Sequence, residues 1–186
     1  GKEIRVLTGI LYMYMKLVVL DGYTENPGDL DWRGMEALGD LTVYARTDHS
    51  QVKERMQDAD AVIINKVPMT RELMQEIKQL RYIGVLATGY DVVDIEAARD
   101  LHIAVTNVPG YGTDTVAQYA IALLLEVTSR IGHHAKRVKE GEWANNADWC
   151  FWDYPLMELS GRTMGIIGFG RIGRKVAEIA QALGMH

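Results

Sequence analysis

Residues 164–183 constrain the fold of this chain more than any other stretch. An apolar run, 164–168, leads into the pattern Gly-x-Gly-x-x-Gly at Gly168, Gly170 and Gly173, and apolar residues at helical spacing follow. This order predicts a strand, a tight turn and a helix. Such a unit is typical of a dinucleotide site, in which Gly168 permits the turn, Gly170 lets a pyrophosphate approach and Gly173 lets the helix pack closely.

A glycine pattern can also mark an ordinary turn with no ligand. Here the apolar run before the turn and the apolar helix face after it favour the binding interpretation, because the helix amides would then face the phosphates. Dinucleotide folds place an acidic residue for the ribose roughly 20 residues beyond the glycines. The sequence ends at His186. We therefore expect that acidic residue, and the other strands of the unit, to lie outside it.

Composition narrows the classes of function. Of the 186 residues, 48% are hydrophobic and 24% charged, as in ordinary globular proteins. The net charge of −5 without a basic run argues against a nucleic-acid partner, and the apolar runs are too short to cross a membrane. Cys150 is the single cysteine, so no disulfide can form within the chain. With no secretory signal, we expect a cytoplasmic protein.

Residues 1–14 precede Met15, which would be a natural start just before a strand. We expect an extra N-terminal segment, either an expression scar or translated upstream sequence. The alternative is an added strand, because residues 10–14 have high β propensity.

Short apolar runs alternate with helical patterns over the first 110 residues. The strands are expected at 17–20, 41–44, 61–64, 82–86 and 103–105. Thr70 is expected to cap a helix over Glu72–Leu80, and Asp94 another helix as far as Asp100. This order predicts a doubly wound, parallel α/β sheet with right-handed connections.

From about residue 113 the pattern changes. We expect a long helix from Asp114 toward Arg130, a second helix over His133–Lys139, and an irregular aromatic segment over 143–154. The stretch 109–113 contains Pro and Gly and is the expected domain boundary.

Ligands bind open α/β sheets beyond the carboxyl ends of the strands. Ala87, Thr88 and Gly89 follow one expected strand, and the amides of Thr88 and Gly89 could bind a carboxylate. Lys66 follows another strand and could add a positive charge. The alternatives are a plain turn at Gly89 and a solvated Lys66.

No catalytic or metal-binding residue is assigned. The five histidines are expected to be structural or solvated, because none follows a strand toward the expected cleft and none has metal-ligand spacing: His49, His102, His133, His134 and His186. Cys150 lies among aromatic residues and is expected to be a buried, inert thiol. The aromatic segment itself is expected to serve packing, since no basic residues interleave it.

Five ordered motifs, over about nine-tenths of the chain, together resemble the D-isomer-specific 2-hydroxyacid dehydrogenases, and among them most closely the glycerate dehydrogenases, also called hydroxypyruvate reductases. The motifs are Leu17–Tyr23, Leu86–Asp91, Thr106–Thr113, Ala147–Asp153 and Gly168–Gly173. One departure is Gln118, where many relatives carry Glu.

The resemblance implies a flavodoxin-like substrate domain over 15–112, then a hinge and dimer helix and an incomplete Rossmann domain over 113–186. It implies NAD or NADP as cofactor, a small 2-oxo or 2-hydroxy acid as substrate, and reduction of hydroxypyruvate or glyoxylate by hydride transfer. The substrate carboxylate would be held around Ala87, Thr88, Gly89 and Lys66. The pyrophosphate would be lined by the glycine turn, that is, by Gly168, Phe169, Gly170, Arg171, Ile172 and Gly173.

In this family the catalytic Arg, Glu and His lie late in the cofactor domain, so we expect them beyond residue 186 and expect this chain alone to be inactive. Apolar helix faces of an incomplete domain need cover, which predicts a homo-oligomer, with exchange of elements between chains as one route. The alternative function is a non-catalytic binding or assembly module that keeps the flavodoxin-like half.

Overall fold

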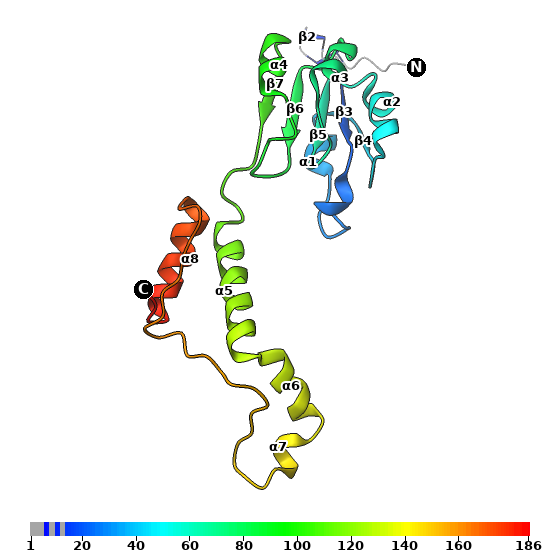
Figure 1. Ribbon diagram of the computed structural model, residues 1–186. Coiled ribbons are helices and arrows are strands. Elements are labelled where there is room, and N and C mark those ends of the chain that lie inside the picture. Colours follow the sequence, from blue (N-terminus) through cyan, green and yellow to red (C-terminus); the bar gives the residue numbers. More distant parts are fainter. Residues whose placement is uncertain (1–5, 8–9, 12–13) are drawn as a thin grey trace. The chain divides into compact units, whose positions relative to one another are not determined.

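The computed structural model describes residues 6–7, 10–11 and 14–186. The chain divides into two compact units, Gly1–Pro109 and Gly110–His186 (Figure 1). Among the first residues, β1 (Val6–Leu7) pairs antiparallel with β2 (Ile10–Leu11). The rest of the segment 1–14, for which we expected a scar or an added strand, lies outside the described residues apart from Tyr14.

The first unit contains a five-stranded, all-parallel sheet, as expected, and each strand lies within two residues of its predicted bounds. The strands are β3 (Met15–Val19), β4 (Gly39–Val43), β5 (Ala61–Ile64), β6 (Tyr82–Val85) and β7 (Ala104–Thr106). Their order is β4-β3-β5-β6-β7. Strands that are buried on both faces, such as β5, read as continuous apolar runs and are therefore visible in the sequence.

Helices α2 (Val52–Met56), α3 (Arg71–Glu76) and α4 (Ile95–Asp100) cover one face of this sheet and close the main core. The short helix α1 (Arg33–Glu36) has no buried residue and lies outside that core, and η1 (Gly22–Thr24) and η2 (His49–Gln51) are short 3₁₀ turns. Met56, Met74 and Ala97 of α2, α3 and α4 lie in one core with alternate strand residues such as Ile64 and Ile83. The core is therefore a layer between helices and sheet.

Both expected helix caps are confirmed. The Thr70 hydroxyl accepts the amide of Leu73 at 3.3 Å, and the Asp94 carboxylate accepts the amide of Ala97 at 2.8 Å. The expected extent of the helix after Thr70 is wrong, because the chain leaves helical geometry at Ile77, where ψ is 85°. Ile77 and Leu80 are nevertheless buried. Their apolar spacing reflects core packing of a loop rather than a longer helix.

The second unit is built on α5 (Thr113–Ser129) and α8 (Arg171–Ala182), which lie side by side in Figure 1. Ala117 and Ile121 of α5 meet Val176 and Ala180 of α8 in a small core. Two further helices, α6 (Ile131–Lys139) and α7 (Glu142–Asn145), precede an extended segment that leads to α8.

The strand expected over 164–168 is not formed. The segment is extended, but its backbone pairing is confined to its start: Met164 donates to the carbonyl of His186 and His186 donates to that of Arg162, each at 2.8 Å. These two bonds have the parallel pattern, and the described residues offer no ladder beyond them. Met164 and Ile166 pack on the small core while Ile167 is fully exposed. The segment 164–168 therefore has the extended backbone of a strand, but no paired strand lies beside it among the described residues.

Candidate functional site

The loop after β6 carries the first group of predicted site residues. Ala87 is buried, whereas Thr88 and Gly89 are exposed. The loop is fixed from the segment after β7, because Val108 donates to the carbonyl of Ala87 at 3.0 Å and Asn107 Nδ2 donates to that of Thr88 at 2.8 Å. Among the described residues, no acceptor pairs with the amides of Thr88 and Gly89. The loop thus offers two ordered, exposed donors.

Lys66 follows β5, the neighbour of β6, so the sheet brings its strand end beside that of Thr88. The side chain of Lys66 is exposed and forms no ion pair within the part of the chain that the structure describes. Its backbone is held, because the Asp21 carboxylate accepts the amides of Asn65 and Lys66, each at 2.8 Å. Two free amides and a nearby cation can bind a small anion such as a carboxylate.

Asp21 and Asn107 were not predicted as site residues. Both hold the loops that carry the predicted ones. Asp21 lies two residues after the end of β3, and this position was the available signal. Its role depends on the pairing of β3 with β5, which brings Asp21 to Asn65, 44 residues away in sequence. The sequence does not reveal that pairing.

The glycine turn before α8 carries the second group, and its glycines differ in environment. Gly168 has a φ of 92°, a left-handed conformation that favours glycine. A Cβ on Gly173 would lie 2.2 Å from the carbonyl oxygen of Gly168, closer than any real contact. A Cβ on Gly170 would meet nothing within 4 Å. The protein itself therefore requires glycine at the first and third positions, but not at the second.

The amino terminus of α8 opens onto this turn. Arg174 donates to the carbonyl of Gly170 at 3.0 Å as the first helical bond, and no side chain caps the helix. The amides of Arg171, Ile172 and Gly173 find no acceptor among the described residues. Free amides and the positive end of the helix dipole make this turn suitable for an anion.

Beside the turn lies a shallow hollow of about 300 Å³ with a largely cationic lining: Thr113, Arg171, Arg174, Lys175 and Glu178. Lys175 donates to Glu178 at 3.0 Å, and this bond raises the pKa of the lysine above its usual value. The guanidinium groups of Arg171 and Arg174 form no ion pair within the described residues. Both cations remain available for a phosphate.

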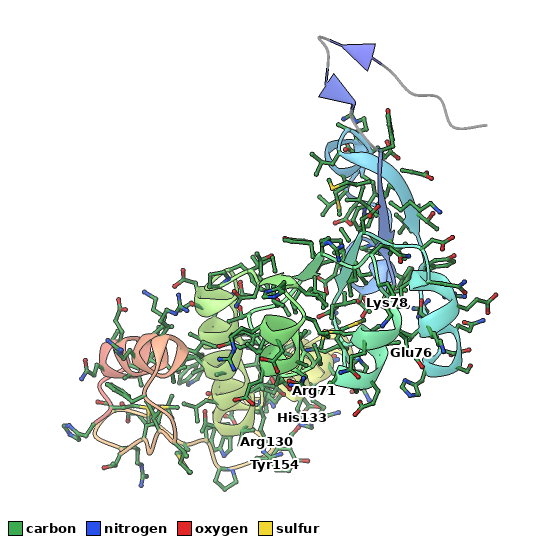
Figure 2. The ribbon with its side chains drawn as sticks, turned by 90° about the horizontal axis from the view of Figure 1, so that it is seen from above. Arg71, Glu76, Lys78, Arg130, His133 and Tyr154 are labelled. Atoms are coloured by element: carbon green, nitrogen blue, oxygen red, sulfur yellow. The ribbon has the colours of Figure 1, made fainter. Side chains whose placement is uncertain are left out.

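The histidines of α6 anchor the aromatic segment that follows. His133 Nε2 and Asp153 Oδ2 share a hydrogen bond of 2.6 Å, which lowers the pKa of Asp153, and Arg137 Nε also donates to that carboxylate. Figure 2 shows Arg130, His133 and Tyr154 together, with the Arg130 guanidinium over the Tyr154 ring. These contacts tie His133 to the aromatic segment.

Cys150 is half-buried rather than buried as expected, because it lines an apolar cavity of about 430 Å³. His134 lines the same cavity, and its buried Nε2 has no partner in the described structure.

Three or more metal-ligating side chains do not gather anywhere among the described residues. Likewise, no helix within them is long and apolar enough to cross a membrane.

Known proteins of one family resemble this chain. The sequence profile of the D-isomer specific 2-hydroxyacid dehydrogenase catalytic domain matches residues 23–180. A hydroxypyruvate reductase of Blautia hydrogenotrophica is 58% identical over 92% of this chain and 54% of its own length. A glycerate dehydrogenase of Methylorubrum extorquens is 38% identical over 73% of this chain and 43% of its own length.

Among solved structures, the NADPH-dependent glyoxylate/hydroxypyruvate reductase of Sinorhizobium meliloti, in complex with NADP and malonate, superposes with a TM-score of 0.69 at 28% identity. The match covers 93% of this chain and 52% of that one. The chain spans about half the length of the curated relatives it matches. Since the profile match covers most of the sequence, the chain belongs to the D-isomer specific 2-hydroxyacid dehydrogenase family.

Proposed function

We propose that this chain is the substrate-binding and initial cofactor-binding part of an NAD(P)-dependent 2-hydroxyacid dehydrogenase that reduces hydroxypyruvate or glyoxylate. Residues 15–112 would be the flavodoxin-like substrate domain and residues 113–186 the first part of a Rossmann domain. The strand order of the first unit is that of flavodoxin, which supports the first assignment.

The observation that carries the proposal is the contrast between Gly170 and Gly173. Gly173 is explained by a protein contact, whereas Gly170 borders open space at three unpaired helix amides. A glycine that no protein neighbour requires, at the end of a helix dipole, suits close approach of a pyrophosphate. Phe169, Arg171 and Ile172 would line the same group, since all three are exposed at the turn.

The loop after β6 would hold the substrate. The amides of Thr88 and Gly89 would donate to its carboxylate, and Lys66 would add positive charge. Each hydrogen bond to a charged group contributes about 1.5–3 kcal/mol. The nicotinamide would supply the hydride, and this chain's own residues would orient the 2-oxo acid by its carboxylate. The relatives named as hydroxypyruvate and glyoxylate reductases support this substrate class.

The test is a fluorescence titration with NADH and with NADPH. Gly170→Ala should lower affinity at least about tenfold, because a methyl group would block approach of the phosphates without contacting the protein. Gly165→Ala is the matched control: its Cβ would also meet nothing within 4 Å, but it lies before the turn. Equal affinities of the two variants, or no binding by the wild-type chain, would refute the cofactor site.

Substrate binding is tested separately. Hydroxypyruvate added to isotopically labelled protein should shift the amide resonances of Thr88 and Gly89, and Lys66→Ala should weaken that shift. The oxidation of NADH in the presence of hydroxypyruvate, followed by absorbance, then measures turnover. Shifts elsewhere, with none at Thr88 and Gly89, would place the carboxylate at another loop.

A homo-oligomer is also proposed, and one face of α5 favours it. Four apolar residues on that face are exposed although they follow helical spacing: Val116, Tyr119, Leu123 and Val127. A second copy could cover them, with or without exchange of elements. Leu123→Glu should dissociate the oligomer in light scattering, while Gln118→Glu, also exposed on α5, should not. A wild-type monomer at high micromolar concentration would contradict this proposal and its assembly-module alternative.

A further inference from the structure

The ends of β5 and β6 lie side by side but differ in one respect. After β6, the amides of Thr88 and Gly89 are unpaired within the described structure. After β5, the amides of Asn65 and Lys66 are both occupied, because Asp21 Oδ1 accepts the first and Oδ2 the second, each at 2.8 Å. A carboxylate of the protein itself therefore fills the loop that carries Lys66.

Asp21 is well placed for this role. It is half-buried at the end of β3, and the chain on both sides of it is tied down. Leu20 donates to the carbonyl of Ile63 at 3.1 Å, and Gly22 donates to that of Tyr44 at 2.9 Å. The carboxylate is thus presented to the loop from the strand next to β5, at a point where the backbone is held by the sheet.

The side chain of Asn65 is held from the same direction. Its Nδ2 donates to the Thr24 hydroxyl at 3.2 Å and also to the Glu25 carboxylate. The backbone and the side chain of the loop are therefore both fixed by residues 21–25. Lys66, next in sequence, keeps its ammonium group exposed.

We propose that Asp21 is a positioning residue that occupies the amides of Asn65 and Lys66 with its own carboxylate. This fixes the backbone from which Lys66 extends and leaves Thr88 and Gly89 as the free amide pair for a substrate carboxylate at these two strand ends. The part of this proposal that concerns substrate, namely that Thr88 and Gly89 bind its carboxylate, rests on the proposed function. The pairing of Asp21 with the two amides does not, and it can be measured without a cofactor.

The first test is amide hydrogen exchange followed by NMR in Asp21→Ala. Exchange at both Asn65 and Lys66 should accelerate about tenfold or more, since each amide loses a charged acceptor. Formate, which reproduces the missing carboxylate in the space left by the side chain, should restore protection in a saturable way. The proposal would be overturned if exchange at Asn65 and Lys66 were the same in Asp21→Ala as in the wild type, or if formate did not slow exchange in the variant.

Asp60→Ala is the matched control. Asp60 is also half-buried and accepts one backbone amide, that of Lys16 at 2.8 Å, but it stands at the opposite end of the sheet, before β5. Its loss should leave Asn65 and Lys66 protected. A general loosening of the sheet would instead accelerate exchange at the two amides in both variants, and that result would count against a specific role for Asp21.

Asp21→Asn keeps the shape of the side chain and one acceptor oxygen. It should lose protection at one of the two amides only, and formate should not restore it, because the amide group fills the space. If Asp21→Ala fails to fold, this variant decides alone, and full protection at both amides would refute the proposal. Formate added to the wild-type chain should shift Thr88 and Gly89 only. Absence of that shift would refute the substrate site while leaving the Asp21 result intact.

Discussion

Replacement of Gly173 by Ala should loosen the second unit specifically. The new Cβ would lie 2.2 Å from the carbonyl oxygen of Gly168, 3.2 Å from the carbonyl carbon of the same residue and 3.3 Å from a methyl group of Ile166. Real Cβ contacts begin at about 3.0 Å. Because the closest atom is backbone, a side-chain rotation cannot relieve the clash, and α8 has to move away from the turn.

The magnitude follows from two opposing effects. Overpacking in a well-packed region costs about 1–3 kcal/mol, and a clash with backbone belongs at the upper end of that range. Alanine favours a helix over glycine by about 1 kcal/mol, which offsets part of the cost. The net loss is about 1–2 kcal/mol, equivalent to a change of about 5–30-fold in the equilibrium between closed and open α8.

Amide hydrogen exchange is the assay, because it reports each unit separately. Exchange of the amides around Val176 and Ala180, which pack on α5, should accelerate by that factor. Amides of β5 should not change and serve as the internal reference. Gly165→Ala, whose Cβ would meet nothing within 4 Å, should leave both regions as in the wild type. If Gly173→Ala leaves α8 fully protected, the close packing of helix and turn is refuted.

Three further outcomes follow from the fold. Ile64→Ala, at a fully buried core position, should cost about 2–5 kcal/mol in urea unfolding, and a loss below 1 kcal/mol would contradict the close packing of that core. Thr70→Ala removes the cap of α3 and should cost about 1 kcal/mol in the same assay, whereas Thr70→Ser should restore most of it; equal losses would rule out capping. The hydrogen bond from His133 lowers the pKa of Asp153, so its stabilising effect is present above the ordinary aspartate pKa and is lost as pH falls through the lowered value. Resonances of residues 149–154 should follow that acid transition in the wild type and not in Asp153→Asn.

Much of the first unit could be predicted because its signals are local. Buried strands are apolar runs, and Thr70 and Asp94 precede helices whose amides they accept. The end of α3 could not be predicted, because Ile77 and Leu80 are buried without remaining helical. The strand before the glycine turn was predicted from the same apolar signal, but a strand also requires a neighbour to pair with, and apolar residues do not supply one.

The candidate sites divide in the same way. The glycine turn is contiguous in sequence, so its pattern was visible, and the exposed Thr88 and Gly89 follow a recognisable strand. The sequence could not separate Gly170 from Gly173, because that distinction depends on which atoms surround each residue. It could not reveal Asp21 either, since a carboxylate after a strand resembles any loop residue until the strand order places it beside Asn65.

In α5, the feature that indicates a partner surface is the side of the helix that stays uncovered, and the number of apolar residues alone does not identify it. The apolar residues of this helix extend over more of its circumference than one neighbouring helix can cover. Within the second unit α8 covers only one side, through Ala117 and Ile121. The opposite side retains Val127, 73% exposed, among the other apolar residues of its face. Since single exposed apolar residues are common and aligned ones are not, this face is where cover by a second copy should be sought first.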